Sequence, residues 1–284
     1  MEPEQEIKLI LLNVGFAEHH ADWNWEKISS PFFRIYLIGE GEATVIIDNI
    51  TYLLLPGHLY LIPPFTTHTD CCNGYFTIYY IHIYEDLKNN ISLFDQMLFP
   101  VQIDSCYLDE LLIKRLHEIN PSSYLRRYDP STYDNRNTLM QSIAENTHIP
   151  LSIQLETNGI LFQLFSKFML KAHKLDINQD TRILKVLHFI YRHIESKISI
   201  SELATQCFMS NDHFIRLFKQ ELKMTPISYI NKKKIEKAQL MLLIKNMAIK
   251  DIAYSLSFEN VSYFNRTFKH YVGKTPMEFK SEYN

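Results

Sequence analysis

Basic side chains recur at matching places in two stretches of the C-terminal part of the sequence. Arg216 and Lys219 follow Phe214 by two and five residues, and Arg266 and Lys269 follow Phe264 by the same spacings. An arginine can donate two hydrogen bonds to the edge of a guanine, and a lysine can reach a backbone phosphate. The repeated spacing therefore predicts two surfaces that read nucleic acid.

The two stretches belong to a longer repeat, which predicts the helices that hold these side chains. Residues 200–226 align with residues 249–276, at an offset of 49 before a short turn and of 50 after it. Residues that cap helix N-termini stand where each helix must begin: Ser199 with Glu202, Ser210, Asn260, and Thr275 before Pro276 with Glu278. Each copy therefore predicts a helix-turn-helix. A helix over residues 183–194 precedes the first copy, and a helix over residues 226–244 joins the two.

The second helix of each copy has two faces. Apolar residues at helical spacing face the core, namely Phe214, Leu217, Phe218 and Leu222, then Phe264, Phe268 and Tyr271 or Val272. The opposite face is predicted to contact DNA through Ser210, Asn211, Asp212, Ile215, Arg216 and Lys219, and through Asn260, Ser262, Asn265, Arg266 and Lys269. A solvated face that is basic by chance would not explain the same pattern twice. For the Lys232–Lys234 run, phosphate contact and a solvated face both stay open.

Charge is divided unequally along the chain. The 284 residues have a formal net charge of -3. Residues 178–284 carry 17 Lys and Arg against 10 Asp and Glu, whereas residues 1–177 carry 12 against 22. An acidic part joined to a basic part indicates that only the basic part meets a polyanion.

The segment from Ile183 to Tyr283 resembles the DNA-binding domain of AraC-type transcriptional regulators. The resemblance rests on ISELATQ, SNDHFIRLFK, TPISYINKKKIEKAQLML, IKDIAYSLSFEN, SYFNRTFK and GKTPMEFK. It implies two helix-turn-helix units whose recognition helices enter successive major grooves, about 34 Å apart on one face of the duplex. Three residues depart from the family pattern: Lys223 and Ser257 stand where glycine is usual, and Lys234 stands where arginine is usual.

The N-terminal part has the pattern of short strands. Runs rich in Ile, Val, Tyr and Phe at residues 33–38, 43–47, 52–55, 59–62 and 75–84 are separated by turn residues, which predicts a β-sandwich or barrel. The stretches FFRIYLIGEGEATVIIDNITYLLLPGHLYLIPPFTTHTD and YFTIYYIHI resemble the cupin-like sensing domain often joined to AraC-type domains. Helical spacing follows at residues 108–119 and 155–173.

These patterns predict an α+β multidomain chain, with an N-terminal cupin-like β-barrel plus helices and a C-terminal all-α domain with two helix-turn-helix units. We expect a ligand-binding domain over residues 1–105, a helical dimerisation or linker region over 106–177, and a DNA-binding domain over 178–284, with the main boundary near Lys174–Asp180. The apolar stripe of the helix at 155–173 either packs within its own domain or forms a dimer seam.

The barrel interior is the expected site for a small effector, because small barrels can hold one small molecule. The candidate ligand-binding side chains are Arg34, Tyr36, Tyr60, His68, Tyr80 and His82. Alternatively these side chains only fill the core, since one sequence does not fix which strand face points inward. Metal-dependent cupins use a His-x-His pair, but the matching strand reads Ala43-Thr44-Val45-Ile46-Ile47, so neither a metal nor another cofactor is expected.

The leading hypothesis is a sequence-specific DNA-binding regulator that responds to a small molecule, by family analogy a sugar, and that activates more than it represses. Expected partners are double-stranded DNA, the effector, a second copy of the chain and RNA polymerase. The alternatives are a constitutive regulator whose β-domain only dimerises, and a cupin-type enzyme, against which the missing ligands and the lack of any other catalytic motif argue. The acidic start, the short apolar runs and the spacing of Cys71, Cys72, Cys106 and Cys207 favour a cytoplasmic protein without membrane contact.

Overall fold

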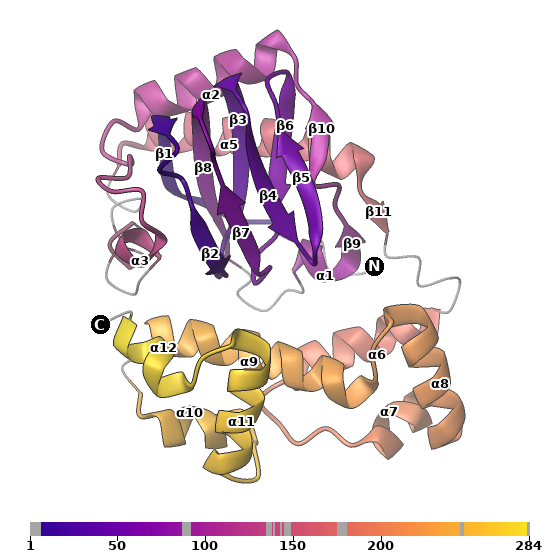
Figure 1. The fold of residues 1–284 in the computed structure, drawn as a ribbon. Coiled ribbons are helices and arrows are strands. Elements are labelled where there is room, and N and C mark those ends of the chain that lie inside the picture. Colours follow the sequence, from indigo (N-terminus) through magenta and orange to yellow (C-terminus); the bar gives the residue numbers. More distant parts are fainter. Residues whose placement is uncertain are drawn as a thin grey trace. The chain divides into compact units, whose positions relative to one another are not determined.

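The computed structural model describes residues 7–86, 92–134, 149–174, 181–244 and 247–282, together with positions 138, 140–142 and 144. The backbone divides into two compact units, Met1–Ala172 and His173–Asn284 (Figure 1). The predicted boundary at Lys174–Asp180 follows this division directly, and its residues 175–180 lie outside the described part.

The N-terminal unit contains two antiparallel sheets (Figure 1). The first has the strand order β1 (Leu9–His20), β8 (Tyr75–Glu85), β3 (Phe33–Gly41), β6 (His58–Ile62) and β10 (Gln102–Asp104). The second has the order β2 (Trp25–Ile28), β7 (His68–Cys71), β4 (Ala43–Ile47) and β5 (Ile50–Leu54). The predicted β-rich domain is thus confirmed, with its strands in two separate sheets and not in one closed barrel.

Strand alternation gives the first sheet two different faces. On β3, Phe33, Ile35 and Leu37 pack with apolar helix residues in one buried cluster. Tyr36 and Ile38 point to the other side, where they join Val45 and Ile47 of the second sheet in another cluster. The first sheet is therefore covered by helices on one face and by the second sheet on the other, which explains why its strands read as near-continuous apolar runs.

Two tight connections fix how these strands pair. Asp48 and Asn49 both have positive φ, at 49° and 64°, which is the conformation of the predicted hairpin turn between β4 and β5. Gly41 ends β3 with a φ of 71°, and a Cβ there would lie 2.1 Å from the Tyr75 carbonyl oxygen. Only glycine fits at this position, because a side chain would collide with backbone.

Four helices complete the described part of the N-terminal unit: α1 (Leu93–Gln96), α2 (Tyr107–Ile119), α3 (Pro130–Tyr133) and α5 (Leu151–Lys171). The short strand β9 (Met97–Leu98) directly follows α1. α2 and α5 pack together against the first sheet. On α5, Leu161, Leu164 and Phe168 are fully buried, so the apolar stripe packs within its own unit. Leu155, at 64% exposure, lies on the opposite face of that helix.

After the short strand β11 (His173–Lys174), the regular elements in the described part of the C-terminal unit are helices. Its first half contains α6 (Thr181–Arg192), α7 (Ile200–Gln206) and α8 (Asn211–Leu222). The long helix α9 (Pro226–Ile244) leads to the second half, which contains α10 (Ile249–Ser255), α11 (Val261–Val272) and α12 (Pro276–Glu282). Helix α9 contacts α8, α10, α11 and α12, so it forms the spine of the unit. Among the described residues of the whole chain, no helix is long and apolar enough to cross a membrane.

Candidate nucleic-acid interface

The predicted caps start the two helices that carry the basic residues. Ser210 accepts a hydrogen bond from the backbone N–H of His213 at 3.4 Å, and Asn260 accepts one from Tyr263 at 2.7 Å. These bonds satisfy N–H groups that a helix start leaves without partners. The oxygens of Ser210 and Asn260 therefore hold the helix ends, which leaves their remaining hydrogen-bonding capacity for any DNA contact.

The repeat extends to the backbone conformation at its turns. Phe208 and Ser257 occupy equivalent positions and both adopt the left-handed conformation, with φ of 55° and 53°. Lys223 and Gly273 follow the two helices α8 and α11, and their φ values are 58° and 81°. Lys223 and Ser257 are the two residues that stand where the family usually has glycine. Both keep the backbone conformation that glycine would adopt most easily.

The two basic helices bury the faces that periodicity predicts. Phe214 and Phe218 of α8, and Phe264 and Phe268 of α11, are fully buried. Leu217 and Leu222 are partly buried against the apolar cluster that α6, α7, α8 and α9 form in the first half of the unit. The packing of these faces fixes how α8 and α11 are turned about their axes.

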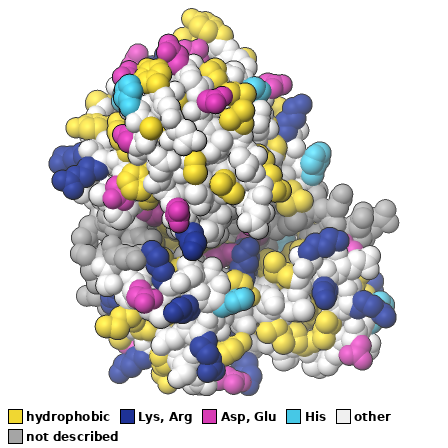
Figure 2. All heavy atoms as spheres, in the orientation of Figure 1, with side chains coloured by type: hydrophobic (Ala, Val, Ile, Leu, Met, Phe, Trp, Pro, Cys, Tyr) yellow, Lys and Arg dark blue, Asp and Glu magenta, His cyan; other side chains and the backbone are white. Residues whose placement is uncertain are grey.

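The opposite faces are open to solvent. Among the predicted DNA-contacting residues, the following are exposed: Ser210, Asn211, Asp212, Arg216, Lys219, Asn260, Ser262, Arg266 and Lys269. Ile215 and Asn265 are half-buried, and the Oδ1 atom of Asn265 is buried without a hydrogen-bond partner among the described residues. In Figure 2, dark blue Lys and Arg side chains stand at several places over the helices α6–α12.

The lysine run in α9 differs from both sequence-based interpretations. Lys234 is 5% exposed, and its Nζ atom donates to the Ser196 carbonyl at 3.2 Å. Lys233 pairs with Glu236 at 2.6 Å and is largely buried at its side chain. The prediction of a phosphate-binding or solvated run is therefore wrong for Lys234, because that side chain lies inside the unit.

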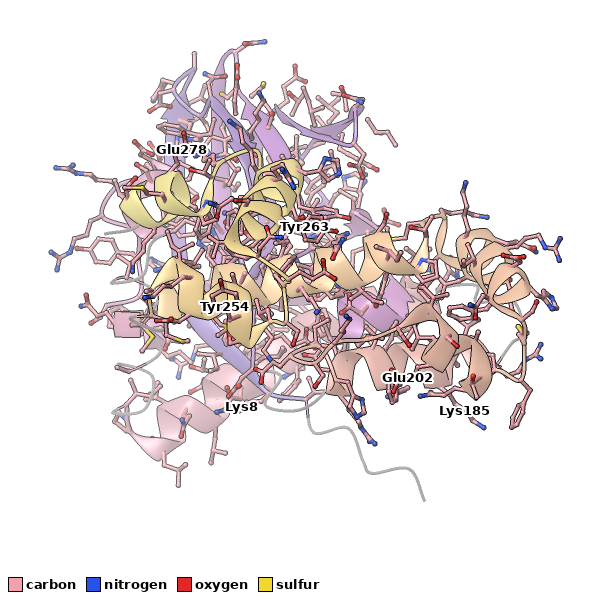
Figure 3. The ribbon with its side chains drawn as sticks, turned by 90° about the horizontal axis from the view of Figure 1, so that it is seen from below. Lys8, Lys185, Glu202, Tyr254, Tyr263 and Glu278 are labelled. Carbon is pink, nitrogen blue, oxygen red and sulfur yellow. The ribbon has the colours of Figure 1, made fainter. Side chains whose placement is uncertain are left out.

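Sequence reasoning passed over two exposed residues on the basic helices. His213 and Tyr263 stand at equivalent places in α8 and α11, one residue before the buried phenylalanine. The hydroxyl of Tyr263, which Figure 3 labels on α11, accepts a hydrogen bond from Asn231 of α9 at 2.9 Å. His213 and Tyr263 are separated by the repeat offset of 50 residues, which is the signal that could have identified them as a pair.

The six candidate ligand residues of the N-terminal unit are all buried, at 1–4% exposure. The strand register brings five of them to one face, because Arg34 pairs with His82, while Tyr36 pairs with both Tyr80 and Tyr60. Tyr36, Tyr60 and Tyr80 belong to the core cluster between the sheets. His68 lies on β7 of the second sheet, which packs against the same face of the first sheet.

Two of these tyrosines use their hydroxyls to hold backbone. The Tyr60 hydroxyl accepts from the Leu55 N–H at 2.7 Å and donates toward the Leu53 carbonyl at 3.1 Å. The Tyr80 hydroxyl accepts from the Leu125 N–H at 2.8 Å. Gly15 makes room for Tyr80, since a Cβ at that position would lie 2.3 Å from the hydroxyl oxygen. Tyr60 and Tyr80 therefore have structural roles of their own.

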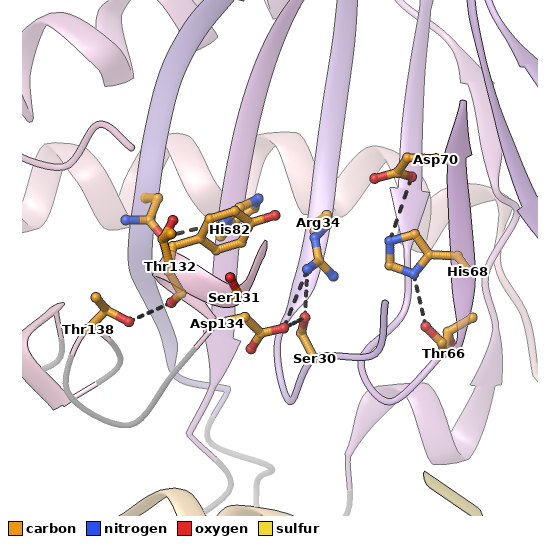
Figure 4. Close-up of polar contacts among 12 residues, drawn as sticks. Ser30, Arg34, Thr66, His68, Asp70, His82, Ser131, Thr132, Asp134 and Thr138 are labelled. Atoms are coloured by element: carbon orange, nitrogen blue, oxygen red, sulfur yellow. Dashed lines mark hydrogen bonds and ion pairs between the residues drawn. The ribbon is translucent and has the colours of Figure 1, made fainter. Parts of the chain in front are cut away.

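Arg34, His68 and His82 lie in a buried polar cluster (Figure 4). Arg34 donates to the Ser30 hydroxyl at 2.6 Å and lies 3.8 Å from the Asp134 carboxylate, to which Ser30 also donates. Asp134 directly follows α3, so this contact ties the segment after α2 to β3. Strand alternation could have indicated Asp70, which follows His68 on the same face of β7, but nothing in the sequence pointed to Asp134.

Burial shifts the proton equilibria of this cluster. It raises the pKa of Asp70 to about 7 and that of Asp134 to about 6, although Arg34 opposes both shifts. Burial and the nearby Arg34 charge lower the pKa of His68 to about 3. His68 is therefore neutral near pH 7, and its 3.8 Å approach to Asp70 is not an ion pair.

Three polar atoms in this cluster have no hydrogen-bond partner among the described residues: Arg34 Nε, His68 Nε2 and Asp70 Oδ1. One is a donor, and the others can accept. Native structures seldom leave buried polar atoms without partners, so these three atoms mark a place that an ordered water, an ion or a ligand can occupy. Within the described part of the chain, no group of three or more His, Cys, Asp or Glu residues could hold a metal ion.

Comparisons with known proteins agree with the geometry of the C-terminal unit. Residues 203–282 match a family of helix-turn-helix domains. The chain is 26% identical over 151 residues to the uncharacterized HTH-type transcriptional regulator YdeC of Bacillus subtilis (strain 168), which covers 51% of this chain and 49% of that protein. It is 30% identical over 106 residues to an uncharacterized HTH-type transcriptional regulator of Staphylococcus aureus (strain COL), covering 37% of this chain and 14% of that protein. The chain thus spans about half the length, or less, of these curated relatives.

Among solved structures, the chain is similar to unsaturated fatty acid bound wild-type ToxT from Vibrio cholerae strain SCE256. The TM-score is 0.53 with 16% sequence identity, and the match covers 99% of this chain and 98% of that one. At this identity the likeness shows the shared fold, a β-rich N-terminal domain followed by a helical domain. Together with the repeated helix-turn-helix geometry, the family match identifies residues 203–282 as a helix-turn-helix domain.

Proposed function

We propose that the chain is a sequence-specific DNA-binding transcriptional regulator of the AraC type. The observation that supports this most is the repeated pair of exposed basic faces on α8 and α11, carried by Arg216 with Lys219 and by Arg266 with Lys269. The N-terminal halves of the two helices enter successive major grooves, where the arginines read guanines and the lysines hold phosphates. Because phosphate contacts release counterions, the affinity falls steeply with salt.

Selection from a pool of randomised duplexes with the full chain tests this proposal, followed by gel shifts on the recovered site. Arg216→Ala and Arg266→Ala should each cost about 1–3 kcal/mol and relax the preference at one base position. Lys185→Ala, an exposed basic residue of α6, is the matched control and should leave base preference unchanged. Wild-type affinity and preference in both arginine variants would refute the assignment of the reading helices.

The N-terminal unit in this proposal binds a small effector at the polar cluster around Arg34. The unpartnered donor and acceptors there suit a ligand with hydroxyl groups, such as a sugar, better than they suit a carboxylate, which would face Asp70 and Asp134. The fatty acid held by ToxT makes an acyl carboxylate the competing ligand class.

Tryptophan fluorescence separates the two ligand classes, because the two tryptophans of the chain, Trp23 and Trp25, both belong to the N-terminal unit. A monosaccharide panel should raise the melting temperature of this unit, whereas unsaturated fatty acids should not. Stabilisation by the fatty acids alone would reverse the assignment of ligand class. Without a shift from either panel, the constitutive regulator becomes the preferred reading.

The proposed regulator also contacts a second copy of the chain and RNA polymerase. Exposed apolar residues on α2 and α5, including Leu108, Leu111, Leu155 and Phe162, supply the surface by which two copies form a homodimer. Leu155→Glu should shift the sedimentation coefficient toward that of a monomer, whereas Glu156→Gln on the same helix should not. The bound regulator activates transcription by contacting RNA polymerase, which a reconstituted transcription assay on the selected site would measure.

A further inference from the structure

The two halves of the C-terminal unit meet at a place other than the joining helix α9. The turn of the second half, residues 256–258, lies against the loop that follows α6 in the first half. Ser257 Oγ donates a hydrogen bond to the Glu195 carbonyl at 2.6 Å. The next carbonyl of that loop, on Ser196, accepts from Lys234 Nζ at 3.2 Å.

Lys234 connects this loop with the second half. Its Nζ atom lies 5.6 Å from the centre of the ring of Phe258, the residue that follows Ser257 in the sequence. Phe258 is itself buried and stacks edge-on against Phe264 of α11, with ring centres 5.1 Å apart. This path therefore runs from the loop after α6, through Lys234 of α9 and Phe258, to the core side of the second reading helix, whereas the Ser257 bond joins the two halves directly.

The equivalent position in the first half has no such role. Phe208 has nearly the same φ as Ser257, 55° against 53°, but its side chain is 93% exposed. Glycine would adopt this backbone conformation without strain at either position. At residue 257 the chain instead carries a hydroxyl that reaches the other half of the unit.

We infer that Ser257 and Lys234 are positioning residues that lock the second reading helix to the first and thereby set the spacing between the two half-sites that the protein accepts. This inference rests on the proposed DNA binding. A single joining helix allows the halves to bend and twist about it, whereas a second contact away from its axis removes that freedom. One base pair corresponds to about 3.4 Å along the duplex, so a rigid unit discriminates against a shift of that size.

Ser257→Gly is the sharpest perturbation, because it removes the hydroxyl while relieving the backbone strain of a positive φ. Phe208→Gly is its matched control, since it relieves the same strain without breaking a contact between the halves. The half-sites recovered from a randomised duplex pool are moved apart or together by one base pair, and the affinity of each full-length protein is measured on these altered sites. Wild type and Phe208→Gly should lose about tenfold or more in affinity, and Ser257→Gly should lose about threefold or less. An equal loss in all three proteins overturns the inference.

A measurement without DNA separates this inference from the proposed function. Hydrogen exchange of residues 193–199 should be at least threefold faster in Ser257→Gly than in wild type and Phe208→Gly. If the pool yields no bound duplex, the proposed function fails. Hydrogen exchange of residues 193–199 then tests by itself whether Ser257 holds the two halves together. Unchanged exchange in Ser257→Gly overturns the lock, whatever DNA the protein binds.

Discussion

The carboxyl group of Asp70 should control how the stability of the N-terminal unit depends on pH. Asp70 is 3% exposed, and its Oδ1 atom faces the Nε2 atom of His68 at 3.8 Å. The Nδ1 atom of His68 lies 3.0 Å from the Thr66 carbonyl, where it must donate, so the Nε2 atom of the neutral ring carries a lone pair. An ionised Asp70 would set two acceptors against each other, whereas a protonated Asp70 or an asparagine amide places a donor between them.

The magnitude follows from the pKa of Asp70, which burial raises from 3.8 to about 7 in the folded protein. Because the folded-state pKa lies above the unfolded one, the folded state binds the extra proton. This contribution to stability is complete below pH 3.8 and is lost as the pH rises through about 7. The two pH units between 5 and 7 correspond to about 2.7 kcal/mol. Asp70→Asn does not titrate, so its stability relative to wild type should grow by about that amount between pH 5 and pH 8.

Urea unfolding at pH 5 and pH 8, followed by tryptophan fluorescence, measures this difference in the N-terminal unit alone. Asp134 titrates in both proteins, so its contribution largely cancels. Asp104→Asn, which changes a carboxylate whose side chain is 96% exposed, is the matched control and should show no such growth. If Asp70→Asn and wild type differ by the same amount at both pH values, the reasoning from burial is refuted.

The remaining predictions concern single contacts. Arg34→Met leaves the Asp134 and Asp70 carboxyls without their cation and should destabilise the N-terminal unit by about 3–5 kcal/mol in urea unfolding; a loss below about 1 kcal/mol would contradict a central role for Arg34. Gly41→Ala should lower the melting temperature much more than Gly57→Ala, because both residues have positive φ but only a Cβ at residue 41 meets backbone; similar losses would show that the collision is relieved. Burial lowers the pKa of Lys234 to about 8 from 10.5, so the unfolded state binds the extra proton and the C-terminal unit should gain stability as the pH rises from 8 to 10.5. Thermal unfolding followed by circular dichroism should show this gain in wild type but not in Lys234→Met, and parallel pH profiles would exclude it.

Hydrophobic periodicity and capping residues predicted the C-terminal unit closely, because α7, α8, α9, α11 and α12 each start at a capping side chain. The joining helix was expected over residues 226–244, and α9 has those bounds. The caps at Ser210 and Asn260 were also predicted, since capping depends on residues next to one another in sequence. The burial of Lys234 could not be foreseen, because it depends on a loop 38 residues away.

The N-terminal unit was predicted less completely. Strand β4 was expected with its observed bounds, since Ala43–Ile47 is apolar and closed by a turn. Strands β1, β2 and β7 were missed, because their sequences mix polar and apolar residues and only pairing with distant strands makes them extended. The same reason hid Asp134 from the candidate site, as it reaches Arg34 across 100 residues of chain.

The two copies of the repeat in the C-terminal unit have the same backbone conformation at their turns but different side chains on the exposed faces of α8 and α11. Asp212 and Ile215 of α8 stand where α11 has Ser262 and Asn265. A pair of identical readers related by twofold symmetry binds a palindrome and cannot distinguish its ends. In the proposed DNA complex, the two unlike faces of α8 and α11 contact different half-sites, so the order of those half-sites sets the direction in which a bound copy lies along the duplex.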